Sequence, residues 1–219
     1  MAIKPSVVSG LRLVWMLYLF DMDNVLYDYQ WRIRMYGLEE LTGHDFHELR
    51  RRWWNDEGEW LAEKGVPPTG EEYLRLVNEA LESDLTTEQW LFHRKAGMTP
   101  RPEIIEIARL ASTLGDVALL TNNGALIGEH LADIAPEIAD IFGEHLYATA
   151  HFRARKPEPE VYVNALKHLG HQPHDVLFID DMPENIRGAE SIGITGEWFQ
   201  PNHDPDALEA VVRGFATRS

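Results

Sequence analysis

An apolar run from Leu13 to Phe20 leads directly into two acidic residues, Asp21 and Asp23, and no other segment limits the possible folds of this chain as strongly. A continuous apolar stretch of this length is typical of a strand buried on both faces of a parallel sheet. It is far shorter than the ~20 residues of a membrane-spanning helix. No small-residue cleavage site follows it, as a signal peptide would require. We therefore expect a central strand over 13–20 with Asp21 at its carboxyl end.

The residues before this strand show no clear periodicity. Because a buried strand needs little chain ahead of it, we interpret Met16 as the natural start and the residues before it as a wrongly assigned extension that the natural protein lacks. Intact-mass analysis of protein from the native source tests this interpretation, and the presence of residues 1–15 there would contradict it.

Residues 28–99 have a different sequence pattern: their apolar residues recur at helical spacing, and no convincing β pattern is present. Thr69, followed three residues later by Glu72, predicts a capping box that starts one helix after the Pro67-Pro68 break. We expect about four helices here, forming a small helical domain with its own core.

The segment after Pro100 alternates between strand and helix patterns. Helices are predicted at 101–114, 157–169 and 183–192, and strands at 116–120, 146–148, 176–179 and 195–199. Strands separated by helices indicate a parallel sheet covered on both faces, which is an α/β fold. The expected division is a core of residues 13–27 and 100–219 with a helical insertion at 28–99.

Composition excludes several classes of function. The 219 residues include 20 basic and 36 acidic side chains, a formal net charge of −16. Such a surface repels nucleic acids and anionic lipids, so we expect neither nucleic acid nor a membrane as a partner. The absence of Cys excludes disulfides, thiolate catalysis and Cys-ligated zinc. These observations favour a soluble, cytoplasmic protein.

The residues that could bind a ligand or catalyse a reaction lie at strand ends or before helices. Asp21, Thr121, Lys156 and the pair Asp180-Asp181 all lie in such positions, and ligands bind at the carboxyl edge of an open parallel sheet. Crowded carboxylates repel one another and need a proton or a cation to coexist. Oxygen ligands without Cys or His suit Mg²⁺. With a cation, a lysine and a hydroxyl, the edge becomes a receptor for a phosphoryl group that a carboxylate attacks.

Four segments in order resemble the motifs of the haloacid dehalogenase (HAD) superfamily. They are FDMDNVLYD at 20–28, LLTNNG at 119–124, KPEPEVY at 156–162 and FIDDMPENIRGAESIGI at 178–194. The resemblance covers 13–27 and 100–200, and the helical insertion lies where that superfamily carries its C1 cap. It implies a Rossmann-like, HAD-like parallel sheet core with an inserted small α-helical cap domain, and Mg²⁺ as the cofactor.

The resemblance also implies roles for individual residues. Asp21 matches the nucleophile and a metal ligand. Asp23 matches the general acid/base, and its backbone carbonyl matches a second metal ligand. Thr121 and Asn122 match the phosphate-binding second motif, and Lys156 matches the lysine that offsets negative charge on the nucleophile and the phosphoryl oxygens.

In the fourth motif, Asp181 matches the main metal ligand, with Asp180 beside it acting directly or through water. Asn185 matches a supporting polar residue that holds water. The sequence departs from the family pattern at Asn24, where glycine is common. Asn tolerates unusual backbone angles, so its N–H remains able to meet phosphate.

These roles predict a Mg²⁺-dependent phosphatase that hydrolyses a small phosphorylated metabolite through an aspartyl-phosphate, as a monomer or homodimer. One alternative is a sugar phosphomutase of the β-phosphoglucomutase type, which would interconvert isomers rather than release phosphate. Another is a catalytically silent phospho-ligand sensor, against which the intact motif residues argue. A true dehalogenase is disfavoured, because that branch needs no metal and lacks an acid at the position of Asp23.

Two further groups of cations are open to interpretation. Arg50 to Arg52 could hold a second anionic group of the substrate, but a solvated helix face paired with neighbouring acids is favoured. An acidic protein that binds an anion needs a locally positive entrance, and Arg32, Arg34 or Arg187 are candidates for it beside Lys156.

Overall fold

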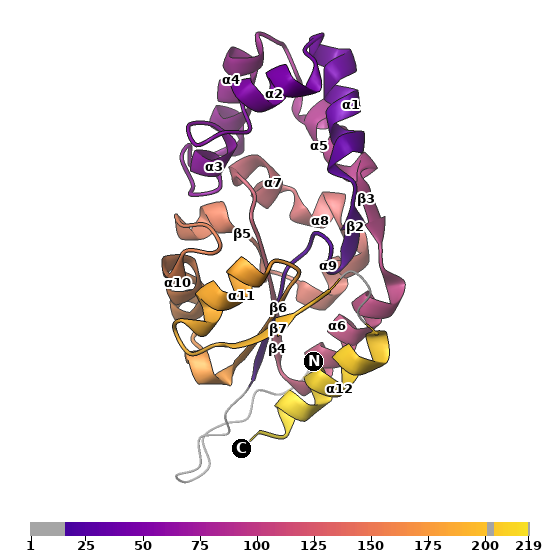
Figure 1. Cartoon of the computed structure of the whole chain (residues 1–219), viewed down its shortest axis with the longest axis vertical. Coiled ribbons are helices and arrows are strands. Elements are labelled where there is room, and N and C mark those ends of the chain that lie inside the picture. The colour runs from indigo at the N-terminus through magenta and orange to yellow at the C-terminus, as the bar shows by residue number, and fades with distance from the viewer. Residues whose placement is uncertain (1–15, 201–203, 219) are drawn as a thin grey trace.

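The computed structural model describes residues 16–200 and 204–218, and residues 1–15 lie outside this range. The interpretation of Met16 as the natural start therefore stays a prediction. The core is a five-stranded parallel sheet in the order β5-β4-β1-β6-β7 (Figure 1). Its strands are β1 Leu17–Phe20, β4 Asp116–Thr121, β5 Leu146–Ala148, β6 Val176–Asp180 and β7 Thr195–Trp198. The predicted α/β class and the parallel sheet are confirmed.

The central strand is β1, which pairs with β4 on one side and β6 on the other. All four of its residues are buried, as the apolar run predicts. Within the described residues the strand begins at Leu17, so the expected range of 13–20 is longer than the strand there. Because β1, β4 and β6 run in the same direction, the residues that follow them meet at one edge of the sheet.

Helices cover both faces of the sheet, and alternate side chains of β1 supply the two cores. Tyr18 and Phe20 belong to one buried cluster, and Leu17 and Leu19 to the other. The helices on the first face are α6 Pro102–Leu114, α9 Pro136–Phe142 and α12 Pro205–Ala216, and those on the second are α10 Pro159–Leu169 and α11 Pro183–Glu190 (Figure 1). The short helices α7 Ala125–Glu129, α8 Leu131–Ile134, η1 Thr149–Phe152 and η2 Pro173–Asp175 complete the connections.

Two helix boundaries in the core have clear physical causes, and one of them differs from its expected position. α6 ends before Gly115 as predicted, but Gly115 has an extended backbone, and a Cβ there would lie 2.4 Å from the carbonyl oxygen of Met16. Close approach, rather than a left-handed turn, requires this glycine. α10 begins at Pro159 and not at Pro157, because a residue that precedes proline, here Glu158, is disfavoured in the helical region.

Residues 28–99 fold as five helices above the carboxyl edge of the sheet (Figure 1). They are α1 Trp31–Thr42, α2 Phe46–Arg52, α3 Glu59–Ala62, α4 Gly70–Leu81 and α5 Thr87–Ala96. The side chain of Thr69 accepts a hydrogen bond from the backbone N–H of Glu72, so the N-cap half of the predicted capping box is present at α4. We call α1 to α5, residues 31–96, the cap helices. Their buried aromatic residues Trp53, Tyr73 and Trp90 form the centre of this layer.

The expectation of no β structure in this segment is wrong at both of its ends. Strand β2, Tyr27–Tyr29, pairs antiparallel with β3, Met98–Pro100, and the pair joins the cap helices to the core (Figure 1). Each strand has only three residues, and they pair across about 70 residues of chain. Strands this short carry no readable period, so the pairing and not the local pattern defines them.

Candidate active site

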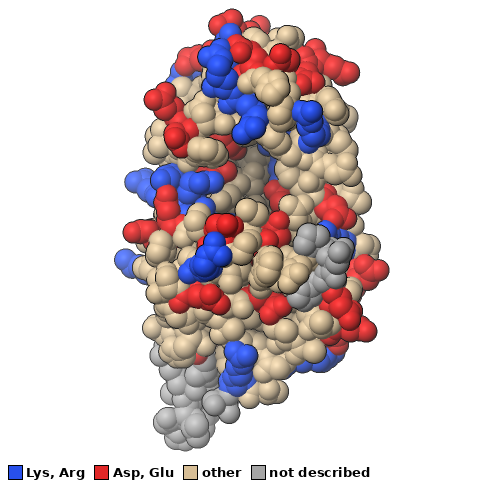
Figure 2. Space-filling view, in the orientation of Figure 1, with Lys and Arg blue, Asp and Glu red and all other residues tan. Residues whose placement is uncertain are grey.

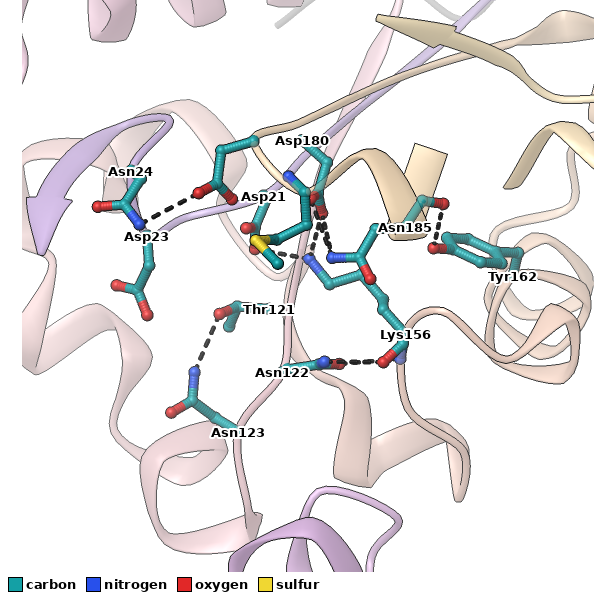
Figure 3. A network of polar contacts seen from close by, with 12 residues as sticks. Asp21, Asp23, Asn24, Thr121, Asn122, Asn123, Lys156, Tyr162, Asp180 and Asn185 are labelled. Atoms are coloured by element: carbon teal, nitrogen blue, oxygen red, sulfur yellow. Dashed lines mark hydrogen bonds and ion pairs between the residues drawn. The ribbon is translucent and has the colours of Figure 1, made fainter. Parts of the chain in front are cut away.

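The acids of the first and fourth motifs follow strands that end at the carboxyl edge of the sheet, beneath the cap helices. Asp21 directly follows β1, Thr121 ends β4, and Asp180 ends β6 with Asp181 next to it. Figure 3 shows the side chains of Asp21, Thr121 and Asp180 converging from their separate strands. Figure 2 shows a hollow in the surface between the cap helices and the core. The structure therefore brings Asp21, Asp180 and Asp181 together, with Thr121 at the same edge of the sheet.

Lys156 is the only cation that ion-pairs directly with Asp21 among the described residues. Its Nζ lies 2.7 Å from Oδ1 of Asp21 and 2.7 Å from Oδ2 of Asp180. Lys156 is 1% exposed. Although burial lowers its pKa, the carboxylates of Asp180 and Asp21 outweigh that effect and hold the pKa of Lys156 above its usual value. The lysine therefore stays charged between the two acids.

Asp180 is fully buried, and hydrogen bonds engage both of its oxygens. Oδ1 accepts from the backbone N–H of Met182 at 2.8 Å and from Nδ2 of Asn185 at 2.9 Å. Oδ2 accepts from Lys156 at 2.7 Å and from the same Asn185 amide at 3.0 Å (Figure 3). A carboxylate engaged this fully is better suited to position Lys156 and Asn185 than to bind a cation.

Asp181 is the less engaged of the two neighbouring acids. It is half-buried, and its Oδ2 accepts a hydrogen bond from Nδ2 of Asn24 at 3.2 Å. Asn24 itself has a φ of 59°. This left-handed conformation favours glycine, and Asn tolerates it, as expected from the sequence. Asp181 therefore keeps oxygen lone pairs that can face a ligand.

Asp21, Asp180 and Asp181 each offer one carboxylate oxygen, and these atoms lie within 4.8 Å of one another. Burial raises the pKa of Asp21 well above its usual range, and the neighbouring carboxyls of Asp180 and Asp23 add to that rise against the opposing charge of Lys156. Burial, followed by Asp180, also raises the pKa of Asp181. One lysine does not balance this many acids, and an all-oxygen donor set fits a hard divalent cation such as Mg²⁺.

The second motif is held together by its own amides. Asn122 forms two hydrogen bonds with the backbone of Lys156, donating to its carbonyl at 3.0 Å and accepting from its N–H at 2.9 Å. Asn123 donates to Oγ1 of Thr121 at 2.9 Å, which leaves the hydroxyl hydrogen of the buried Thr121 free to point elsewhere. The side chain of Asn122 thus positions the Lys156 segment, whereas the sequence predicted it as a phosphate donor.

Asp23 lies apart from the acidic cluster (Figure 3). Both of its carboxylate oxygens accept hydrogen bonds of 2.7 Å from Nη2 of Arg94, a residue of α5 that is 1% exposed. Asp21 and Asp23 therefore have different partners, Lys156 of the core for Asp21 and Arg94 of α5 for Asp23. Sequence reasoning missed Arg94, because it belongs to no motif and is 71 residues away in the chain.

The other arginines that the sequence offers as anion-binding groups lie in different environments. Arg51 and Arg52 pair with Glu48 on the surface of α2, as the solvated-face interpretation predicts. Arg34 is not part of an open entrance, because it is 3% exposed within the cap helices.

None of the helices in the described part of the chain combines the length and apolarity that crossing a bilayer requires.

A family model described as haloacid dehalogenase-like hydrolase matches residues 15–193. The chain is 24% identical to Phosphatase MT3486 of Mycobacterium tuberculosis (strain CDC 1551 / Oshkosh) over 210 residues, which cover 90% of this chain and 92% of that protein. It is also 48% identical to flavin mononucleotide hydrolase 1 of Arabidopsis thaliana, over 46 residues that cover 21% of this chain and 19% of that protein.

Solved structures show the same fold. The HAD family enzyme bt-2542 from Bacteroides thetaiotaomicron, in complex with magnesium and inorganic phosphate, superimposes with a TM-score of 0.74 at 20% identity, covering 89% of this chain and 98% of that one. A HAD phosphatase from Thermococcus onnurineus gives a TM-score of 0.60 at 20% identity, covering 86% and 88%. Because the family match runs through both the sheet and the cap helices, this chain belongs to the haloacid dehalogenase-like hydrolase family.

Proposed function

We propose that this protein is a Mg²⁺-dependent phosphatase that hydrolyses a small phosphorylated metabolite through an aspartyl-phosphate on Asp21. The observation that carries the proposal is the buried contact of Asp21 with Lys156, beside Asp181 and at the edge where β1, β4 and β6 end. A nucleophilic carboxylate, a fixed cation and a group of oxygen donors are the parts that phosphoryl transfer requires. The names of the two curated relatives support this choice.

In the first step, a carboxylate oxygen of Asp21 attacks phosphorus while the bond from phosphorus to the ester oxygen breaks. Asp23 gives a proton to that leaving oxygen, and the alcohol departs. In the second step, Asp23 takes a proton from water, and the water oxygen attacks phosphorus. The bond from phosphorus to Asp21 then breaks, which releases inorganic phosphate and restores the free carboxylate.

The other residues hold this chemistry in place. Lys156 contacts the nucleophile and is positioned to balance charge on the phosphoryl oxygens. Thr121 has its oxygen engaged by Asn123, so its hydroxyl hydrogen is available to a phosphoryl oxygen. Asp180 positions Lys156 and Asn185 rather than acting on the substrate.

Asp21, Asp181 and the backbone carbonyl of Asp23 are the groups we propose as Mg²⁺ ligands. Bound there, the cation would neutralise charge between the nucleophile and the phosphoryl group. The raised pKa of Asp21 fits this assignment, since a buried carboxyl group needs a nearby positive charge to be an anion at neutral pH.

We propose residues 28–99 as a cap of the C1 type that closes over the site and restricts it to small substrates. Its contacts with the core support this role. Glu63, the residue that follows α3, pairs at 2.5 Å with Arg155, which precedes Lys156 in the chain. On the other side of the site, Arg94 of α5 pairs with Asp23. The cap therefore contacts the chain neighbour of Lys156 and the proposed acid/base itself.

A phosphate-release assay over a panel of phosphate esters, with Mg²⁺ and with excess EDTA, tests the proposal. Flavin mononucleotide belongs in the panel because one relative is named as its hydrolase. We expect release of inorganic phosphate that EDTA stops and added Mg²⁺ restores. Conversion of one sugar phosphate isomer into another without phosphate release would identify a phosphomutase instead. Binding without turnover across the panel would contradict enzyme function.

A further inference from the structure

The buried polar atoms that have no hydrogen-bond partner are concentrated in one place. Across residues 16–200 and 204–218, five buried side-chain nitrogen or oxygen atoms lack a partner, and all five belong to four residues of β2, α1 and α5. They are Oη of Tyr29, Nε and Nη2 of Arg34, Nε1 of Trp90 and Nη1 of Arg94. We call these four residues the donor cluster.

Ring contacts hold the four side chains together. The guanidinium of Arg34 lies over the ring of Trp90 at 4.5 Å, and that of Arg94 lies over the ring of Tyr29 at 4.0 Å. Trp90 and Arg94 are one turn apart on α5, so they share a face of that helix. α1 and α5 pack closely enough that a Cβ on Gly37 would overlap the ring of His93. Stacking on aromatic rings satisfies the charge of the arginines but not their N–H groups.

Hydrogen-bond chemistry specifies what would complete the cluster. The guanidinium and indole nitrogens can only donate, so four of the five unpartnered atoms require an acceptor. The buried carboxylate of Glu59 accepts from Trp53 at 2.6 Å and Tyr73 at 2.5 Å, and it leaves these donors unpaired. Buried donors without acceptors are costly and rare in native proteins. Their concentration next to two positive charges points to an oxygen-rich anion.

The position of the cluster relates this anion to the substrate. Arg94 donates to both oxygens of Asp23 through Nη2 while its Nη1 is unpaired. In the proposed reaction Asp23 serves the leaving oxygen, so the cluster lies on the leaving-group side of the site. The Arg94–Asp23 contact joins the cap helices to the core.

We propose that the donor cluster binds a second anionic group on the alcohol part of the substrate. The substrate class is then a phosphate monoester whose leaving group carries a carboxylate or another phosphate. This inference rests on the proposed phosphatase function and narrows it. A carboxylate and a phosphate share the required chemistry, since each presents several charged acceptor oxygens to guanidinium donors.

A matched series of three-carbon esters tests the inference on the full-length protein with Mg²⁺. The series is 3-hydroxypropyl phosphate, 3-phosphonooxypropanoate and propane-1,3-diyl bisphosphate, which differ only in the group at the far end. We expect kcat/KM for at least one charged ester to exceed that of the hydroxyl ester by about 10- to 100-fold, as charge-assisted hydrogen bonds would produce. The better of the two charged esters identifies the source of the anion.

Variants locate the effect. The test quantity is kcat/KM for the better charged ester divided by kcat/KM for 3-hydroxypropyl phosphate. Arg34→Met should reduce this ratio to about 1, and Arg34→Lys should restore part of it. Arg75→Met is the matched control, since Arg75 is an exposed cap arginine that pairs with Glu79 away from the cluster. If Arg34→Met does not fold, Trp90→Phe removes one donor while keeping a ring, and it should lower the ratio by about threefold or more.

Binding to the Asp21→Asn variant, measured by calorimetry, separates this inference from the proposed function. Tighter binding of a charged ester, lost when Arg34→Met is added, supports the donor cluster even if the wild type releases no phosphate from any ester. Hydrolysis of all three esters with equal kcat/KM and equal affinity would overturn the inference and leave the phosphatase function intact. A charge preference that survives Arg34→Met would overturn it as well.

Discussion

The core and the cap helices both bury charged side chains, but they satisfy them in opposite ways. In the core, both oxygens of Asp180 are engaged and Lys156 lies between two carboxylates. In the cap helices, Arg34 and Arg94 are buried just as deeply, yet three of their nitrogens have no partner. The core groups position one another, and the only outside partner we propose for them is Mg²⁺. The cap groups require an acceptor from outside it, which makes them suited to recognition.

The largest expected effect is at the nucleophile. Asp21→Asn should reduce kcat by roughly 10⁴-fold or more, because an amide does not form the aspartyl-phosphate. Lys156 keeps Asp180 as a partner in this variant, so the fold should persist. Phosphate release and thermal unfolding measured on the same preparation check both parts. Activity within tenfold of the wild type would remove Asp21 from the mechanism.

The second prediction tests whether the core site is held together by its own residues. Asp180→Asn replaces an acceptor of four hydrogen bonds with an amide that faces the amide of Asn185 and the ammonium of Lys156. We expect the free energy of unfolding to fall by on the order of 3 kcal/mol, as when one partner of a buried ion pair is removed. Urea unfolding measures it.

Asp181→Asn is the matched control for this variant, because Asp181 is adjacent in sequence but half-buried and sparsely hydrogen-bonded. It should change the free energy of unfolding by less than about 1 kcal/mol and raise the Mg²⁺ concentration needed for half-maximal activity. Equal destabilisation by the two variants would show that the two acids do not differ in the way their contacts indicate.

The third prediction concerns the contact between the two regions. Burial, together with the nearby Glu59, raises the pKa of Glu63 to about 7 against the pull of Arg155. The folded protein then holds this proton more tightly than the unfolded chain, so the free energy of unfolding falls as pH rises from about 4.5 to about 7. Glu63→Gln should remove on the order of 2 kcal/mol of that decline between pH 5 and pH 8.

Urea unfolding at a series of pH values measures this slope. The control is Glu158→Gln, at a partly exposed residue that pairs with Lys64 across the same contact between cap and core. It should leave the slope unchanged. An identical pH profile for the wild type and Glu63→Gln would mean that Glu63 does not carry the proton.

The core was readable from the sequence because its signals are local. β1 and β6 are short apolar runs that end at acids, and the parallel topology then brings Asp21 and Asp180 together without further information. Even the weak strand at 146–148 is confirmed with its predicted bounds. The start of α10 was misplaced by two residues, since both Pro157 and Pro159 are compatible with a first helical turn.

The contacts of the cap with the core were not readable, because they join residues far apart in the chain. Nothing near Arg94 in the sequence indicates that it pairs with Asp23, 71 residues earlier. The donor cluster likewise depends on how α1 packs against α5, and helical periodicity predicts which face is buried but not which helix meets it. A buried arginine also runs against the usual preference of this residue for the surface.

The smallest expected effect is the one that most directly separates the two regions. Arg34→Met replaces a buried charge that has two unpaired nitrogens with an apolar side chain that packs against the same rings. Because few hydrogen bonds are lost, the free energy of unfolding should change by less than about 1 kcal/mol, or rise. Chemical denaturation without substrate measures this, and Asp180→Asn is the comparison. A loss for Arg34→Met as large as that for Asp180→Asn would show that the cap helices depend on their buried charge as the core does, and that the arginine is structural.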